Sequence, residues 1–365
     1  MYIYLMDDVD SLDFQNLEVI SSIENLINTA YEGCNIIDAK RSTFKYLQGL
    51  DVFGKATLQK LKQIIDFNNE YYPLYDDVDC KICVSGLASS FYKDGNNWVI
   101  PLSSFNYGNF SGLELLAEDE SDAKLLIHAI KHYQLLHSNL KNFNISVVPS
   151  NGGGANIKKI INTKIDAKEK ILVCFCDSDR FSLKSEFGSV TKDCKEISNQ
   201  SDFPCFFFHT EGREIENDLP FYFIDEILTY QNNPDVISLF LKIKKINEID
   251  RDIIKYYDFK EGILFKDIQH ITCAISKDFW QATIEKLDSA GLLEVEKNNL
   301  KDTDIIIPHI SKSIAANVLD WLDFKFDRKP KKVHEVIKND NDAQAWLTHG
   351  EKLFWLASGM KKGRI

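Results

Sequence analysis

The sequence lacks any apolar run of the ~20 residues that a membrane-spanning helix needs. Its opening segment, Met1-Tyr-Ile-Tyr-Leu-Met-Asp-Asp8, also lacks the basic stretch and small-residue cleavage site of a secretory signal. Both absences predict a cytoplasmic protein with no membrane segment. The 365 residues, 44% of them hydrophobic and 27% charged, suffice for two or three domains and exclude a disordered chain.

Metal-type cysteine spacing and positive charge are both scarce. Among eight cysteines only Cys80 and Cys83 are spaced like metal ligands, and no second pair completes a zinc site. Cys174 and Cys176 fall in an apolar run, where we expect reduced, buried thiols. The net charge of −12 is unfavourable for a basic nucleic-acid-binding surface, but it is compatible with an enzyme that concentrates carboxylates around metal ions. Basic residues cluster late in the chain, where they form either a nucleic-acid-binding surface or an ordinary solvated one: Lys325, Arg328, Lys329, Lys331, Lys332 and Lys338.

The middle of the chain alternates short apolar strands with helical stripes. Strands are predicted over 113–117, 144–148, 170–176 and 204–208, and a helix from Ala123 to Leu136 with Ser121 as its N-cap. This alternation predicts an α/β fold with a mainly parallel sheet flanked by helices over residues 113–230. Residues 1–112 read as an accessory domain of unknown role, α/β or mostly helical. Residues 231–365 read as a helical region, with a winged-helix order of helix, helix, strand (291–296) and strand (304–308).

Carboxylates follow three of these predicted strands. Glu118 and Asp122 follow the first strand, Asp177 and Asp179 the third, and Glu214 and Glu216 the fourth. Loops at the carboxyl ends of parallel strands converge, so we expect these acids to form one site. Oxygen ligands favour Mg²⁺ or Mn²⁺, and an extended Asp177-x-Asp179 would turn both carboxylates toward one ion. Taken singly, each pair is also typical of a solvated loop or a helix cap.

These segments resemble the motifs of TOPRIM domains. Leu116-Ala-Glu118-Asp-Glu-Ser-Asp122 is similar to the opening glutamate motif, and Val148-Pro-Ser-Asn-Gly-Gly-Gly154 to the glycine turn after the second strand. Asp177-Ser-Asp179-Arg180 matches the DxD motif. Arg213-Glu-Ile-Glu-Asn217 is similar to a segment of the OLD-family (overcoming lysogenization defect) nucleases and related bacterial defence proteins. The resemblance covers about residues 113–230.

The resemblance implies roles for individual residues. Glu118 would be the acid–base or metal-binding glutamate supported by Asp122, and Asp177 and Asp179 would hold Mg²⁺. Glu216, with Glu214 beside it, would complete the metal shell. His349-Gly350-Glu351-Lys352 is the nearest match to a late Gly-Lys pair, which makes Lys352 the candidate phosphate-stabilising lysine, although an ordinary helix-surface lysine fits as well. We assign substrate contacts to Gly152, Gly153, Arg180, Lys331 and Lys332.

Two departures from the family pattern bear on this interpretation. Asp119 stands where TOPRIM motifs carry glycine, which adds charge and bulk at a tight turn. Asn151-Gly-Gly-Gly154 lacks the Gly-Lys-Ser/Thr ending of a nucleotide-binding loop, so nucleotide gating would come from a partner protein, such as a sensor or ATPase.

The sequence therefore predicts a Mg²⁺- or Mn²⁺-dependent nuclease that acts on DNA or RNA. The family resemblance implies an effector of bacterial antiphage defence, and a homo-oligomer is compatible with this interpretation. Three alternatives stay open. The first is a non-catalytic TOPRIM-like module that regulates a partner protein or binds nucleic acid. The second is a tRNA-cutting toxin, and the third is a phosphatase or nucleotide hydrolase.

Overall fold

The computed structural model describes residues 1–106, 110, 112–326, 337, 338 and 340–361. It divides into two compact units, of which the first comprises Met1–Cys174, Glu196–Phe207 and His349–Ile365, and the second Phe175–Lys195 and Phe208–Thr348. These units cut across the three predicted ranges, so that division stays a prediction. In the described ranges, no helix combines the length and apolar character needed to cross a membrane.

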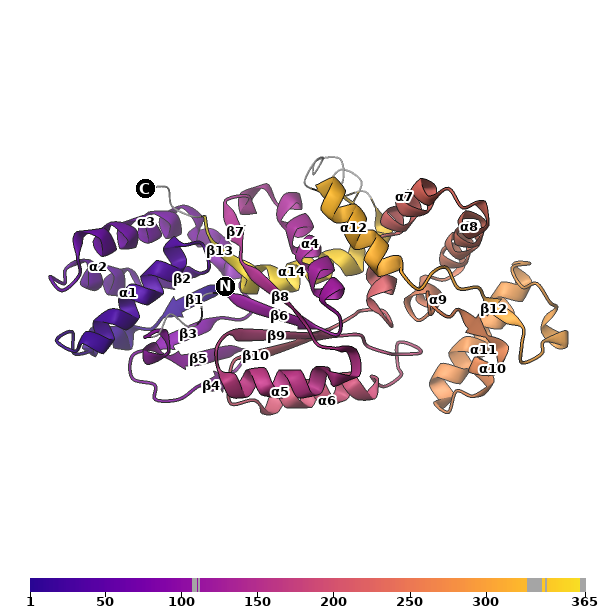
Figure 1. Cartoon of the computed structure of the whole chain (residues 1–365), viewed down its shortest axis with the longest axis horizontal. Helices are drawn as coiled ribbons and strands as arrows, with labels where there is room; N and C mark the ends of the chain where they lie inside the picture. Colours follow the sequence, from indigo (N-terminus) through magenta and orange to yellow (C-terminus); the bar gives the residue numbers. More distant parts are fainter. Residues whose placement is uncertain (107–109, 111, 327–336, 339, 362–365) are drawn as a thin grey trace. The chain divides into compact units, whose positions relative to one another are not determined.

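The N-terminal part of the first unit is built on a five-stranded sheet with the order β2-β1-β3-β5-β4. Its strands are β1 (Tyr2–Leu5), β2 (Ile36–Ala39), β3 (Ile82–Ser85), β4 (Tyr92–Asp94) and β5 (Asn97–Pro101). The pairs of β1 with β2 and β3, and of β3 with β5, are parallel, whereas β4 is an antiparallel edge strand. The helices α1 (Leu17–Tyr31), α2 (Arg41–Gln48) and α3 (Lys55–Tyr71) gather beside β1 and β2 (Figure 1). This part is therefore α/β and not mostly helical.

The C-terminal strand of the chain also belongs to the first unit. β13 (Ser358–Met360) pairs antiparallel with β7 (Phe143–Ile145). A side chain at Gly359 would place its Cβ 2.0 Å from the carbonyl oxygen of Gly33. Only glycine allows this close approach of two backbones, which fastens the last strand to the turn before β2.

A second sheet has the order β10-β9-β6-β8. Its strands are β6 (Leu113–Ala117), β8 (Val147–Asn151), β9 (Ile171–Cys176) and β10 (Cys205–His209), and β6 and β8 are parallel. Every residue of β9 is buried, as expected for a central strand covered on both faces. α4 (Glu120–Leu136) lies on one side of β6 and β8, and α5 (Ile157–Ala167) on the other (Figure 1). The predicted mixed α/β fold with a parallel-rich sheet flanked by helices is confirmed, while the predicted second strand divides into β7 and β8.

The second unit is mainly helical. The helices that lie wholly in this unit are α7 (Phe221–Gln231), α8 (Pro234–Ile249), α9 (Arg251–Lys255), α10 (Phe265–Gln269), α11 (Ala274–Ser289) and α12 (Ile314–Phe326). Two others, α6 (Ser189–Gln200) and α14 (Gln344–Ala357), begin in this unit and continue into the first. A short antiparallel ribbon joins β11 (Ile263–Leu264) to β12 (Ile305–Ile307). The predicted strand at 291–296 is wrong. Gly291 adopts a left-handed φ of 66° at the end of α11, and the strand partner of β12 precedes α10.

Candidate metal site in the second unit

The loops that follow β9 and β10 are fastened together within the second unit by a buried serine. Ser178 is fully buried; its hydroxyl donates to the carbonyl oxygen of Gly212 at 2.5 Å, and its N–H donates to the Thr210 hydroxyl at 2.8 Å. The N–H of Asp179 donates to the carbonyl oxygen of Arg213 at 2.9 Å. The middle residue of the Asp-Ser-Asp motif is therefore structural, and it fixes the backbone between the two aspartates.

The two aspartates of this motif are held differently. Asp177 Oδ1 accepts a hydrogen bond from the N–H of Ile215 at 2.9 Å. Asp179 has a left-handed φ of 52°, a conformation that aspartate tolerates better than most residues. The predicted extended alternation of the two carboxylates is therefore wrong. Gly188 packs directly on Asp179, since a Cβ at Gly188 would lie 2.4 Å from Asp179 Oδ2.

The Arg213–Asn217 segment docks on residues 254–260 of the same unit. The N–H of Arg213 donates to the carbonyl oxygen of Lys255 at 2.7 Å, and its guanidinium pairs with Asp258 at 3.1 Å. The amide of Asn217 donates to the carbonyl oxygens of Ile254 and Tyr257, both at 2.7 Å. Arg213 and Asn217 thus hold the segment in place.

A lysine that the sequence reasoning missed faces the two glutamates of this segment. Lys260 Nζ lies 3.1 Å from Glu214 Oε2 and 3.1 Å from Glu216 Oε1. The Glu216 side chain is only 2% exposed, and that of Glu214 is 14% exposed. No local sequence signal marks Lys260, which occurs in an ordinary Asp-Phe-Lys-Glu-Gly loop.

Burial and charge shift the protonation of this acidic cluster, defined as Asp177, Asp179, Glu214 and Glu216. Burial raises the pKa of Asp179, and it likewise raises the pKa of Glu216, where Glu214 adds to the effect. For Lys260 burial acts to lower the pKa, but the two glutamates outweigh it and raise the pKa above its usual value. The positive charge of Lys260 opposes both of these shifts and favours the ionised carboxylates.

One carboxylate oxygen of the cluster lacks a hydrogen-bond partner. Glu216 Oε2 is buried and has no hydrogen-bond partner among the residues that the structure describes. A buried carboxylate oxygen without a partner is costly unless a cation or a proton satisfies it. The oxygen-only donor set of the cluster suits Mg²⁺ or Mn²⁺. A divalent ion or a proton on Glu216 Oε2 would satisfy this oxygen.

The two other predicted acids lie in the first unit, at the start of α4. Asp119, not Ser121, is the N-cap of this helix: its Oδ1 accepts from the N–H of Ser121 at 2.8 Å, and Asp122 Oδ2 accepts from the N–H of Asp119 at 3.2 Å. The prediction of Ser121 as the cap is wrong because the aspartate two residues earlier closes a reciprocal capping box. Asp119 therefore has a structural role where TOPRIM motifs carry glycine. Glu118, half-buried, directly precedes this cap.

The predicted glycine turn, also in the first unit, holds the end of β6. The N–H of Gly152 donates to the carbonyl oxygen of Ala117 at 2.7 Å, and the N–H of Gly154 donates to that of Glu118 at 2.9 Å. A Cβ at Gly152 would lie 2.5 Å from the Ala117 oxygen, and Gly153 has a φ of 69°. The glycines are thus needed to position the Glu118 backbone, and their predicted substrate contacts stay predictions.

Two of the predicted basic residues, Arg180 and Lys352, belong to different units. The Arg180 guanidinium stacks on the Phe187 ring at 4.1 Å, and its Nε is buried without a hydrogen-bond partner in the described ranges. Lys352 is exposed on α14 in the first unit. Gly350 of the predicted Gly-Lys match serves packing, since a Cβ there would lie 2.4 Å from the carbonyl oxygen of Ala129 in α4. Lys331 and Lys332 lie outside the described residues.

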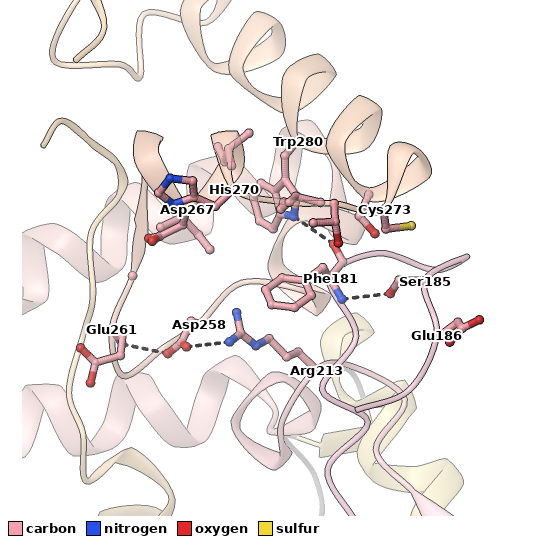
Figure 2. Close-up of a pocket in the computed structure, with 16 residues that line it drawn as sticks. Phe181, Ser185, Glu186, Arg213, Asp258, Glu261, Asp267, His270, Cys273 and Trp280 are labelled. Carbon is pink, nitrogen blue, oxygen red and sulfur yellow. Dashed lines mark hydrogen bonds and ion pairs between the residues drawn. The ribbon is translucent and has the colours of Figure 1, made fainter. Parts of the chain in front are cut away.

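A cavity of about 700 Å³ lies beside Arg213, within the second unit (Figure 2). The half-exposed Phe181 ring faces it, with the Arg213 guanidinium 4.8 Å from the ring centre. The backbone of Phe181 is fixed on both sides, because Trp280 Nε1 donates to its carbonyl oxygen at 2.9 Å and its N–H donates to the Ser185 hydroxyl at 3.0 Å. A cavity of this size suits a small molecule or one unit of a polymer.

The cysteines give no oxidised pair among the described residues. Cys174, Cys176, Cys194 and Cys205 are buried and form no disulfide with a described residue, as predicted for Cys174 and Cys176. In the second unit, the sulfurs of Cys176 and Cys194 lie within 4.8 Å of each other. Thiolates are soft ligands, so this pair does not belong to a magnesium site.

No family model matches the chain, and neither a curated protein nor a solved structure matches it. The TOPRIM resemblance therefore rests on the four sequence motifs alone.

Proposed function

We propose that the protein is a Mg²⁺- or Mn²⁺-dependent nuclease that hydrolyses phosphodiester bonds in DNA or RNA. The observation that supports this most is the acidic cluster in the second unit, whose buried Glu216 carboxylate has an oxygen without a partner among the described residues. Natural proteins rarely bury several carboxylates together unless a cation neutralises them. The order of the four TOPRIM-like motifs along the chain agrees with this reading.

In this proposal the acidic cluster holds the metal ion. A bound Mg²⁺ or Mn²⁺ would activate water and stabilise negative charge on the phosphoryl group. From the family resemblance alone, we propose Glu118 as the proton-transferring group. Asp122 would support it, and Lys352 would stabilise the phosphate.

We further propose that the cavity beside Arg213 receives part of the nucleic acid. Phe181 offers an exposed ring whose backbone is held rigid by Trp280 and Ser185, and a rigid ring of this kind stacks well on a nucleobase. Arg213 borders both this cavity and Glu214, at 3.9 Å from the glutamate. A base on Phe181 would therefore bring its neighbouring phosphate toward the acidic cluster.

The biological setting is proposed from the family resemblance alone. The protein would act as an effector of bacterial antiphage defence, gated by a partner protein such as a sensor or ATPase, and would form a homo-oligomer.

The test is cleavage of supercoiled plasmid and of total tRNA with Mg²⁺ or Mn²⁺. We expect the full-length protein to cut at least one substrate and Asp177→Asn/Asp179→Asn to cut neither. Glu285→Gln is the matched control, because Glu285 has a 65% exposed side chain paired with Lys297 and does not line the proposed nucleic-acid cavity. Equal cleavage by wild type and the double variant would overturn the proposal. Cleavage of tRNA alone would identify the RNA-cutting toxin.

A non-catalytic TOPRIM-like binding module is the second candidate. The observation that favours it is Lys260, whose ammonium already neutralises part of the charge on Glu214 and Glu216. Such a module would bind Mn²⁺ or a partner and leave plasmid, tRNA and mononucleotides intact. Hydrolysis of mononucleotides without polymer cleavage would instead identify a nucleotide hydrolase.

A further inference from the structure

A second cavity of the second unit, of about 420 Å³, lies between α7 and α12, which pack against each other (Figure 1). Glu226 and Tyr230 line it from α7, and Asp320, Trp321 and Phe324 line it from α12. Residues three or four positions apart share one face of a helix, so one face of each helix bounds the cavity. We call this surface the aromatic groove.

The aromatic groove combines a fixed ring with an exposed one. Trp321 is half-buried, and its ring packs against Tyr222 at 6.0 Å and against Phe223 at 5.5 Å between ring centres. Because Phe223 is fully buried, these contacts hold the indole in place. Tyr230, in contrast, is 89% exposed. Large apolar side chains gathered at a hollow in the surface are typical of an interaction site.

The charges that border the aromatic groove are negative. The described residues that line it include Glu226 and Asp320 but no lysine or arginine. Neither carboxylate forms an ion pair with a described residue, whereas the neighbouring Asp225 pairs with Lys244. Burial raises the pKa of the Tyr222 hydroxyl, and the charge of Glu226 adds to this shift. The groove therefore joins aromatic surface to negative charge that no described cation offsets.

This combination selects the class of ligand. The two carboxylates repel the phosphates of a nucleic acid, and a wholly apolar segment would cover them without supplying a partner. A cation on an apolar stem satisfies both features, because aromatic faces attract positive charge and carboxylates pair with it. Arginine is the protein side chain that does both, since its planar guanidinium stacks on rings and donates hydrogen bonds to carboxylates.

We propose that the aromatic groove binds an arginine of a partner protein. The guanidinium stacks on Trp321 and Tyr230, and Glu226 and Asp320 offset its charge. The net charge of −12 on the whole chain attracts a basic partner from a distance. The inference uses none of the residues assigned to the proposed nuclease activity, so it holds or fails separately from that activity.

The test measures the binding of dye-labelled peptides to the full-length protein by fluorescence anisotropy. In the first peptide, arginines alternate with glycines. In the second, citrulline replaces each arginine and keeps its shape without its charge, and in the third, leucine replaces it. Tyr230→Ala removes the exposed ring of the groove, and Glu226→Gln/Asp320→Asn removes its two charges.

Two control variants remove the same kinds of group elsewhere. Tyr72→Ala removes an exposed ring of the first unit. Asp278→Asn/Glu285→Gln removes two charges from exposed positions of α11, so it matches the double variant in net charge. Circular dichroism identifies which variants fold. The high exposure of Tyr230 keeps the proposal testable even where the double variant does not fold.

We expect the wild type and both controls to bind the arginine peptide, and to bind the citrulline and leucine peptides roughly tenfold more weakly or less. Tyr230→Ala and the double variant should each weaken binding of the arginine peptide by roughly fivefold, as expected for the loss of a cation–π contact or of its paired charges. Equal binding of the three peptides, or unchanged binding by both groove variants, would overturn the proposal. Absence of binding by the wild type up to about 1 mM peptide would also overturn it. Light scattering that shows a dimer for the wild type and a monomer for Tyr230→Ala would make a second copy of the chain the occupant instead.

Discussion

Two groups of acids that look alike in the sequence have different surroundings in the structure. At the start of α4 in the first unit, Asp119 and Asp122 accept backbone N–H groups and close a capping box. After β10 in the second unit, the largely buried Glu214 and the buried Glu216 face an ammonium group. A carboxylate that follows a strand can therefore either cap a helix or belong to a charge cluster, and its partners in three dimensions determine which of the two roles it has.

Glu118 stands between these two cases, since it directly precedes the cap and yet matches the catalytic glutamate of the resembling family. We expect Glu118→Gln to slow phosphodiester cleavage by roughly 100- to 10,000-fold, the range that general acid–base groups contribute. Mn²⁺ binding should stay unchanged, because the proposed ion site lies in the second unit. Gel-based cleavage rates and calorimetry check the two halves. Unchanged cleavage would place Glu118 with the structural acids of α4.

The ion pair between Arg213 and Asp258 tests how strongly the second unit depends on charge. Arg213→Ala leaves Asp258, whose side chain is 10% exposed, without its partner, and we expect a loss of about 3–5 kcal/mol in the free energy of unfolding. Arg251→Ala is the control, because that arginine is 61% exposed and pairs with Asp342 at 3.9 Å; its loss should cost less than about 1 kcal/mol. Urea unfolding measures both values, and equal losses would contradict the account.

Gly188 offers a test of whether the position of the Asp179 carboxylate matters. A Cβ at this position would lie 2.4 Å from Asp179 Oδ2 and 2.5 Å from Asp179 Cβ, so Gly188→Ala must push the carboxylate aside. We expect cleavage to fall by roughly 100-fold, as for an ångström-scale misplacement of a catalytic group. Gly54→Ala, which meets nothing within 4 Å, should leave it unchanged. Similar rates for both variants would show that the position of Asp179 does not matter.

The cap of α4 should give the smallest effect. Asp119→Ala is expected to cost about 1 kcal/mol in the free energy of unfolding, as is typical of a lost N-cap. Hydrogen bonds from the Ser121 backbone and hydroxyl lower the pKa of Asp119. The cap therefore stabilises the fold above the usual pKa near 4, and this contribution disappears as the pH falls through the lowered value. Urea unfolding at neutral and acidic pH should show the two proteins converging in acid, and a constant difference would contradict this assignment.

The strands of the candidate site were predictable from the sequence. β6 was predicted at its observed bounds, and β9 and β10 to within one residue at each end, because each is a short apolar run between polar turns. The acids that follow them were found for the same reason. Local patterns suffice wherever one segment determines its own structure.

Other features depended on partners far away in the chain. Lys260 and Asp258 gain their roles from Glu214, Glu216 and Arg213, and no spacing rule connects these segments. Asp179 has a left-handed backbone, and its side chain packs closely against Gly188. Such contacts are set by tertiary packing, which a single sequence does not display.

Turn and cap chemistry was predictable only in part. The sequence indicated a capped helix after the first strand, but two acceptors, Asp119 and Ser121, competed for the N-cap. Asp119 is the N-cap, because it forms a reciprocal capping box with Asp122. The strand predicted over 291–296 does not form, because Gly291 ends α11 and the chain then follows an irregular path.

The central claim is that the acidic cluster of the second unit holds a divalent ion. The most direct measurement is calorimetric titration of Mn²⁺ into EDTA-treated wild type and Asp177→Asn/Asp179→Asn, with Glu285→Gln as the control. We expect one bound ion in the wild type and the control and none in the double variant. The same binding in all three proteins would place any metal elsewhere and contradict the account.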